Sequence, residues 1–161
     1  TRLRTVTGVQ TCALPIWDGM AVTRTASGAR LQCVFQRLEG EATCEGLWLN
    51  STSADMTADR FRIVASAIER SGCVGSPLPP EDAHGARCLV SSLPLFGDIS
   101  VHTQTVRFSR PALVEEYTVS MDGVRQDFVV AQRPAGTGEL QLFCRAASKG
   151  EQCAQIGRAH V

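Results

Sequence analysis

The sequence predicts an all-β protein, an antiparallel β-sandwich of roughly eight strands with one long Pro/Gly-rich connection. Three observations lead to this fold class: apolar side chains recur mostly at every second position, turn-forming residues interrupt these runs at short intervals, and few stretches have a helical period. The 161 residues, 43% hydrophobic and 20% charged, suit one globular domain. The sixteen basic and sixteen acidic residues balance, so the chain has no excess of positive charge with which to bind a nucleic acid. No apolar run is long enough to span a bilayer.

The first expected strands lie before the long connection. Residues 30–36 place apolar side chains at every second position, as a half-buried strand does. Residues 47–49 form a short apolar run that ends at the polar turn 50–53. Residues 61–70 also alternate, although a helix over residues 57–70 fits the same stretch.

The middle of the chain is dominated by turn-forming residues. Residues 72–98 contain four prolines and four glycines, which predicts an irregular connection with one short strand at residues 87–91. Two short alternating runs, 99–101 and 106–109, then predict a hairpin.

The clearest local signal follows. Residues 113–120 and 124–130 are β-rich runs joined at Met121-Asp122-Gly123, and an Asp-Gly dipeptide between such runs favours a tight hairpin. A last strand is expected at residues 139–144, after a turn at residues 134–138. No internal repeat is evident.

The two ends of the chain resemble the two strands of one oligonucleotide. The peptide VQTCALPI at residues 9–16 can be encoded by GTTCAGACGTGTGCTCTTCCGATC, and the reverse complement of that sequence encodes IGRAHV, the peptide at residues 156–161. The oligonucleotide is similar to a common sequencing-library adapter, whose upstream bases encode residues 6–8. We therefore expect residues 1–16 and 156–161 to be adapter-derived, and residues 17–155 to be a metagenomic fragment of a longer protein, with any signal peptide outside it.

Removing these ends changes the charge and the cysteine count. Without Arg2, Arg4 and Arg158, the sixteen basic residues become thirteen against sixteen acidic ones, a net charge near −3. Without Cys12, the seven cysteines become six. An even number of cysteines in a small domain predicts disulfides and an oxidising compartment.

The spacing of the six cysteines suggests three pairs, although six cysteines allow 15 connectivities. Two pairs are placed symmetrically about an expected hairpin turn, and the third brackets the long connection, where a crosslink would restrict the chain. The predicted disulfides are Cys33 with Cys44, Cys73 with Cys88, and Cys144 with Cys153.

Two other roles for these cysteines stay open. Six free thiols could lie buried and act as small hydrophobic side chains. Alternatively, Cys73, His84 and Cys88 could bind a metal, but they lack the paired close spacing of zinc sites. We expect no metal site.

Catalytic motifs are not found in the sequence. It contains no G-x-S-x-G elbow, phosphate-binding loop, dinucleotide-binding fingerprint or H-E-x-x-H pair. His102 alternates with Val101 and Thr103, so we expect a strand residue rather than a general base. We predict no catalytic or cofactor-binding residue, no cofactor, and no enzymatic activity.

Four carboxylates lie on the predicted hairpin and could bind calcium or act as an acid/base pair. Consecutive strand residues point to opposite faces, so Glu115 and Glu116 are not expected to converge on one ligand. We expect these two side chains, together with Asp122 and Asp127, to lie on a solvated face.

The remaining candidate sites are a glycosylation sequon and the two tryptophans. Residues 50–52 read Asn-Ser-Thr, a short motif that occurs often by chance. Trp17 and Trp48 could form a platform for carbohydrate if exposed, but Trp48 stands between two leucines and is expected in the core.

Two segments carry a family resemblance. RFSRPALVEEYTVSMDGVRQDFVVAQRPAGTGELQL, residues 107–142, resembles a segment of large uncharacterised secreted or surface proteins of environmental bacteria, and residues 40–70 resemble the portion before it. The resemblance implies a non-catalytic β-rich module that precedes propeller-like or other repeats, and it places residues 61–70 in a strand. Typical features of these segments are a strand with a tyrosine, a turn, a strand containing Gln-Asp-Phe and an Arg-Pro corner. They match Tyr117, Asp122-Gly123, residues 126–128 and Arg133-Pro134 of this chain, whereas its high density of cysteines is not typical.

Two functions from different classes follow. The first is a structural or scaffolding module of an extracellular or cell-surface bacterial protein, whose partners are neighbouring domains of the same chain. The alternative is a carbohydrate-binding accessory module of a secreted enzyme, which would bind polysaccharide through exposed aromatics and the polar face of the hairpin at residues 113–130. Neither involves nucleic acid or membrane insertion.

Overall fold

The computed structural model describes residues 19–53, 60–71, 87–131, 134, 138–148 and 155–160, with backbone alone for residue 71 and for residues 87–91 and 155–160. Within these ranges the chain forms twelve strands and no helix, and every strand pair is antiparallel. The predicted all-β class is therefore confirmed.

Eight strands form the larger sheet. Their order is β1-β2-β3-β4-β5-β11-β12, and β6 pairs with the same edge of β5 as β4 does. Their bounds are β1 Met20–Thr25, β2 Gly28–Cys33, β3 Leu38–Thr43, β4 Gly46–Ser51, β5 Arg60–Ser71, β6 Arg87–Ser92, β11 Leu140–Ser148 and β12 Gln155–His160.

Four strands form the smaller sheet, in the order β10-β9-β8-β7. Their bounds are β7 Asp98–His102, β8 Thr105–Arg110, β9 Leu113–Ser120 and β10 Gly123–Val130. Both hairpins predicted here are confirmed. Ser120 pairs with Gly123 across Met121 and Asp122, and Gly123 adopts a φ of 124°, a value that favours glycine.

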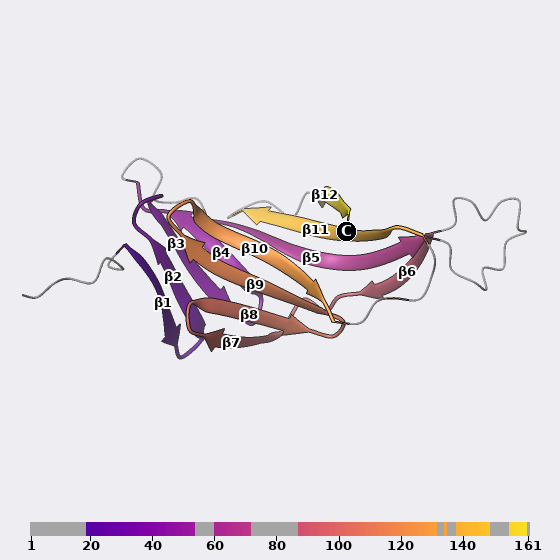
Figure 1. Ribbon diagram of the computed structural model, residues 1–161, viewed down its shortest axis with the longest axis horizontal. Helices are drawn as coiled ribbons and strands as arrows, with labels where there is room; N and C mark the ends of the chain where they lie inside the picture. The colour runs from indigo at the N-terminus through magenta and orange to yellow at the C-terminus, as the bar shows by residue number, and fades with distance from the viewer. Residues whose placement is uncertain are drawn as a thin grey trace, which may run out of the picture.

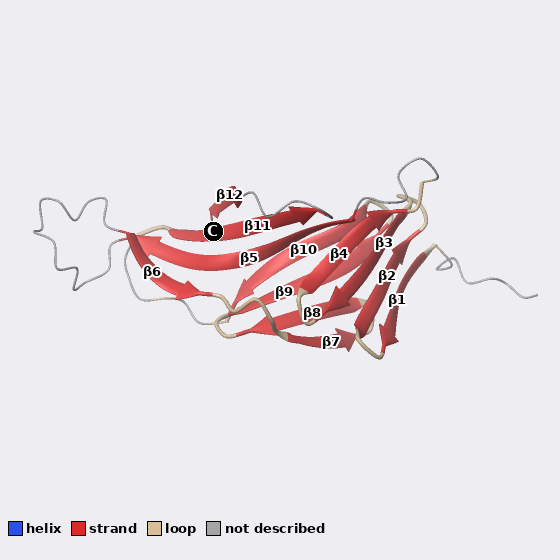
Figure 2. Ribbon diagram, turned by 180° about the vertical axis from the view of Figure 1, so that it is seen from behind, coloured by secondary structure: helices blue, strands red, loops and turns tan. Residues whose placement is uncertain are grey.

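The two sheets lie face to face, as a β-sandwich requires (Figure 1). A first hydrophobic cluster joins strands β2 to β5 to strands β7 to β9 and contains Ala29, Leu31, Ala42, Leu47, Val64, Val101, Val106, Phe108 and Tyr117. A second cluster lies toward the other end and contains Ala65, Ile68, Leu93, Leu113 and Leu142. Figure 2 shows the larger sheet from its outer side, with β5 running along most of its length.

The stretch that could have been a helix is the long strand β5. Its twelve residues pair with β11 along one edge and with β4 and β6 along the other. On the second edge, β4 pairs with residues 60–62 and β6 with residues 67–71, and side chains of the smaller sheet bond the main chain between them at Ile63 and Ala65. Tertiary pairing thus decides between two patterns that fit the sequence equally well.

The structure has more strands than the roughly eight that the sequence indicates, because β1, β3 and β12 give little signal. In β3, Gly40 interrupts the expected strand pattern. A Cβ atom there would lie 2.9 Å from Leu47 Cδ1 and 3.1 Å from Leu49 Cδ2. The glycine is thus required by the close approach of these leucines to the backbone of β3.

The predicted disulfide between Cys33 and Cys44 is wrong. Both residues have free thiols. Cys33 pairs with Leu38, so the β2–β3 hairpin is centred on residues 35–36, whereas Cys44 follows β3 at its far end. Six residues of strand separate the two positions, about 20 Å.

The other predicted disulfides are less fully described. Cys144 also has a free thiol, and its expected partner Cys153 lies outside the described residues. Cys73 lies outside them too, and only the backbone of Cys88 is described. The metal site considered for Cys73, His84 and Cys88 cannot be placed for the same reason.

The two adapter-like ends differ in the structure. Residues 1–16 lie outside the described residues, whereas residues 155–160 form β12, which pairs with residues 141–145 of β11. The origin of residues 156–161 stays a prediction, since an exposed sheet edge can pair with foreign peptide through main-chain hydrogen bonds. No helix long and apolar enough to cross a membrane occurs in the described ranges.

Candidate functional site

A buried polar cluster lies between the two hydrophobic clusters. Leu113, Glu115 and Tyr117 alternate along β9, and all three side chains point into the sandwich. Glu115 is 0% exposed. The expectation that this carboxylate lies on a solvated face is therefore wrong.

Glu115 accepts hydrogen bonds from four donors. Its Oε1 accepts from the Ala65 amide of β5 at 3.0 Å and from Arg110 Nη2 of β8. Its Oε2 accepts from the Tyr117 hydroxyl at 3.1 Å and from Gln126 Nε2 of β10. The carboxylate is therefore held by both sheets at once.

Arg110 completes the connection. Its Nη1 donates to the Ala65 carbonyl at 2.7 Å and to the Pro94 carbonyl at 3.1 Å, and its guanidinium stacks 4.7 Å from the centre of the Phe108 ring. Only Nε of this side chain is buried without a hydrogen-bond partner. One arginine and one glutamate thus bridge β5, the segment before β7, and three strands of the smaller sheet.

Burial shifts the titration of every group in this cluster. It raises the pKa of Glu115 and lowers the pKa of Arg110, while the charge of each partner opposes both shifts. Burial and the nearby Glu115 charge raise the pKa of Tyr117 far above its usual value and that of Cys144 to about 11. The neutral tyrosine and thiol are therefore favoured across the physiological range.

The cluster has little capacity left for chemistry. Glu115 already accepts from four donors and is fully buried, so a substrate would have to displace Ala65, Arg110, Tyr117 or Gln126 to reach it. Breaking such a network in a low-dielectric interior is costly. Its arrangement suits the joining of sheets.

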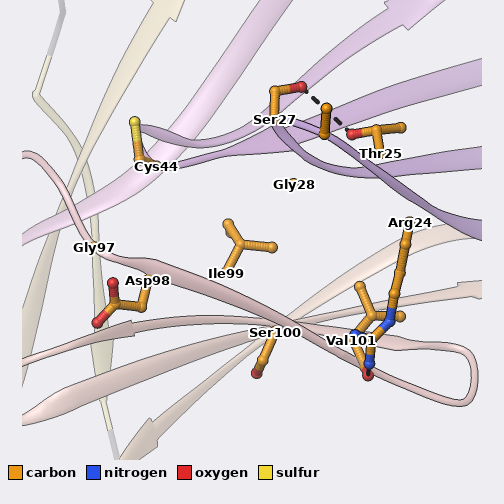
Figure 3. Close-up of a pocket in the computed structure, with 11 residues that line it drawn as sticks. Arg24, Thr25, Ser27, Gly28, Cys44, Gly97, Asp98, Ile99, Ser100 and Val101 are labelled. Carbon is orange, nitrogen blue, oxygen red and sulfur yellow. Dashed lines mark hydrogen bonds between the residues drawn. The ribbon is translucent and has the colours of Figure 1, made fainter.

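A pocket of about 370 Å³ opens between the edge strands β1 and β7 (Figure 3). One side is formed by the end of β1, the turn that follows it and the start of β2, from Arg24 to Gly28, and by Cys44. The other is formed by residues 97–101, where Ile99 points into the pocket and Asp98 points away from it (Figure 3).

Two hydrogen bonds close the ends of this pocket. Arg24 Nη2 donates to the Val101 carbonyl, and the Gly97 amide donates to the Cys44 carbonyl at 2.9 Å. The polar side chains that line the pocket besides Arg24 and Cys44 are Thr25 and Ser27, whose hydroxyls lie 3.4 Å apart, and Asp98 and Ser100 on the opposite side. No histidine is among the lining residues to activate the Cys44 thiol.

Trp48 lies outside the core, so the expectation from its two leucine neighbours is wrong. Leu47 and Leu49 point into the sandwich, and strand alternation turns the half-buried Trp48 to the outer face of the larger sheet. The guanidinium groups of Arg62 and Arg60 lie 4.6 and 5.5 Å from the centre of its ring. These arginines pair in turn with Glu45 at 3.5 Å and Glu41 at 3.1 Å. Trp17 lies outside the described residues.

The outer face of the β9–β10 hairpin is polar, as expected. Glu116 points outward, opposite to Glu115, which confirms that the two carboxylates do not converge. Glu116 pairs with Arg107 at 2.8 Å, and Asp127 pairs with Arg125 at 2.8 Å. The aromatic side chains of this hairpin, Tyr117 and Phe128, pack inward, which leaves no aromatic platform on the polar face.

Of the remaining predicted residues, those that the structure describes are exposed or half-buried. His102 is exposed at the end of β7, as expected of a strand residue, and Asp122 is exposed in the β9–β10 turn. Asn50 is half-buried in β4, and His84 lies outside the described residues. Within those residues no group of three His, Cys, Asp or Glu side chains could hold a metal ion.

Sequence reasoning missed the buried cluster. Arg110 and Glu115 both continue the inward phase of their strands, which is set by Val106 and Phe108 in β8 and by Leu113 and Tyr117 in β9. Opposite charges at inward positions of adjacent strands were the available signal. No family model, no curated protein and no solved structure matches this chain.

Proposed function

We propose that this chain is a non-catalytic structural module of a larger protein, with neighbouring domains of the same polypeptide as its partners. The observation that carries the proposal is the cluster of Arg110 and Glu115, which uses its buried charges to join the two sheets. A module that holds neighbours in place requires two layers that do not slide, and directional hydrogen bonds between layers oppose sliding in a way that apolar packing does not.

The surface supports the same proposal. On the outer face of the larger sheet, Arg30 pairs with Glu39 at 2.8 Å, in addition to the two pairs beside Trp48. On the smaller sheet, Arg107 and Arg125 are paired as well. Such balanced faces present no strong field to a charged ligand.

The carbohydrate-binding alternative keeps one observation in its favour, the outward position of Trp48. Two arginine guanidinium groups lie over its ring, so a sugar would have to displace them to stack there. We therefore prefer the structural role.

Hydrogen exchange in the full chain tests the structural role directly. If the buried cluster joins the sheets, the slowly exchanging amides of β5 and of β9 will exchange only through global unfolding. The free energies of opening obtained from their exchange rates will therefore be the same. A smaller sheet that opens several kcal/mol more easily than the larger one would contradict the proposal.

Thermal unfolding with a panel of soluble polysaccharides separates the two functions. A structural module will show no shift in Tm, since ligand binding raises Tm only when the folded state binds. A rise in Tm that is abolished by Trp48→Ala, but retained in the matched surface variant His102→Ala, would favour carbohydrate binding instead.

The same proposal places the module outside the cell or at the cell surface of a bacterium. Its support is the resemblance of residues 40–70 and 107–142 to segments of secreted and surface proteins. The free thiols of Cys33, Cys44 and Cys144 remove part of the cysteine argument for an oxidising compartment. Detection of a closed disulfide between Cys73 and Cys88, by alkylation without reductant and mass spectrometry, would restore part of it.

A further inference from the structure

The pocket between β1 and β7 exposes main-chain groups of a strand edge. It lies where the edge strand of the larger sheet faces that of the smaller sheet (Figure 3). Two groups on the β1 side of residues 97–101 are bonded, the Gly97 amide to the Cys44 carbonyl and the Val101 carbonyl to Arg24. Every second residue of an antiparallel strand turns its amide and carbonyl to the same edge. The main-chain groups of Ile99, midway between these two, therefore open into the pocket.

The two bonded ends limit what can pair with this edge. Four residue steps separate Gly97 from Val101, which is about 13 Å of strand. Between them the Ile99 amide is a donor and the Ile99 carbonyl is an acceptor. An extended peptide parallel to β7 could bond both, because a residue in a parallel pair bonds the carbonyl of one residue and the amide of the residue two places further on. The interval thus has the length of about three peptide residues.

Arg24 adds a positive charge at one end of the pocket. Its bond to the Val101 carbonyl holds the guanidinium there, and the other N–H groups of the guanidinium stay available. In the part of the chain that the structure describes, no carboxylate forms an ion pair with Arg24, whereas the nearby Arg30 pairs with Glu39 at 2.8 Å. Asp98, the acidic side chain among the lining residues, points away from the pocket (Figure 3). This end therefore has the charge and the donors that a carboxylate requires.

We propose that the pocket binds the C-terminal end of an extended peptide, which lies parallel to β7 and places its carboxylate on Arg24. The last residue donates its amide to the Ile99 carbonyl, and the third residue from the end accepts from the Ile99 amide. An antiparallel peptide would carry its carboxylate to the other end, where the Cys44 carbonyl repels it. Pairing with a strand edge and capture of a terminal carboxylate are both recurrent modes of peptide recognition. This binding site goes beyond the structural role and does not depend on it.

The test uses acetyl-alanyl-alanine with a free carboxylate, the shortest ligand that has all three groups. Titrated into the full chain and followed by NMR, it should bind saturably at about millimolar concentration and shift the amide signal of Ile99. The C-terminal carboxamide of the same ligand should bind about tenfold more weakly, since it carries no charge for Arg24. An analogue with an ester in place of the last amide should also bind more weakly, because it cannot donate to the Ile99 carbonyl.

Matched variants of the chain assign the charge. Arg24→Gln should weaken binding of the free acid about tenfold and leave binding of the carboxamide almost unchanged. Arg30→Gln, on the neighbouring strand and outside the pocket, should bind both ligands as the wild type does. If Arg24→Gln does not fold, the comparison of acid, carboxamide and ester on the wild-type chain decides.

Three results would overturn the proposal. The first is equal binding of acid and carboxamide to the wild-type chain, and the second is a set of shifted amides that excludes residues 97–101. The third concerns an eight-residue peptide that ends in the same two alanines, which should bind at least as tightly as the short ligand. If only the short ligand binds, the pocket accepts a small acid and not the end of a polypeptide.

Discussion

Two arginine–glutamate arrangements in this molecule use the same chemistry in opposite surroundings. Arg110 and Glu115 meet between the sheets, with side chains 1% and 0% exposed. Arg62 and Glu45 meet on the outer face beside Trp48, where Glu45 is 47% exposed. The first pair is excluded from water, whereas the second is open to water on the side of Glu45, with Arg62 17% exposed.

This difference decides what each pair contributes. Water screens the outer pair and replaces either partner readily, so an exposed ion pair contributes about 0 to 1 kcal/mol. Inside the sandwich, losing one partner leaves the other charge buried and unpaired, which costs about 3–5 kcal/mol. The buried pair therefore determines how the sheets fit together, whereas the outer pair mainly shields Trp48.

The largest expected effect comes from Glu115→Gln. The variant leaves the Arg110 charge without a counter-charge, and we expect the free energy of unfolding to fall by about 3–5 kcal/mol in urea titrations. The matched control is Glu116→Gln, one residue along β9 on the outer face, which should cost less than about 1 kcal/mol. Equal losses in the two variants would show that burial does not separate these two carboxylates.

An alkaline titration tests the same cluster through the Tyr117 hydroxyl and through the Cys144 thiol, which feels the charges of Glu115 and Arg110. The pKa of Cys144 is raised to about 11 from 9.0, and that of Tyr117 is raised above 10.0, mainly by burial. Above these unfolded-state values the unfolded chain releases protons that the folded chain retains, so stability is intact below about pH 9 and falls as the pH rises toward 11.

The measurement uses the one tyrosine of the chain. Phenolate absorbance will stay absent while the protein is folded and will appear together with unfolding. In Cys144→Ala the fall in stability between pH 9 and 11 will be shallower. A phenolate that forms near pH 10 in the folded protein would mean that Tyr117 is hydrated.

The smallest effect is expected at the outer pair. Arg62→Ala removes a stacking contact with Trp48 and an exposed ion pair, so the loss should be about 0.5–1 kcal/mol. Urea unfolding followed by tryptophan fluorescence measures both the stability and the environment of the ring. A loss above about 3 kcal/mol would place this cluster among the interactions that hold the fold.

Much of the fold could be predicted from the sequence because strand alternation is local. The runs expected at residues 113–120 and 124–130 correspond to β9 and β10, and the Asp-Gly turn between them lies where predicted. The weak strands could not be found this way. The pattern of β3 is broken at Gly40, and its glycine is explained only by leucines from neighbouring strands.

The errors share one physical cause. The disulfide between Cys33 and Cys44 required a hairpin centre that pairing moves by several residues. The core position of Trp48 ignored that neighbours in a strand point to opposite faces. Glu115 was assigned by its charge rather than by its phase with Leu113 and Tyr117. In each case the position of the side chain depends on strand register or on the inward and outward alternation along the strand, rather than on the type of residue.

A double-mutant cycle on Arg110 and Glu115 tests the central claim most directly. Arg110→Met, Glu115→Leu and the double variant are compared by urea unfolding of the full chain. We predict that each single variant loses about 3–5 kcal/mol and that the double variant is more stable than either, because it leaves no unpaired buried charge. A double variant whose loss equals the sum of the two single losses would contradict a coupled pair that joins the sheets.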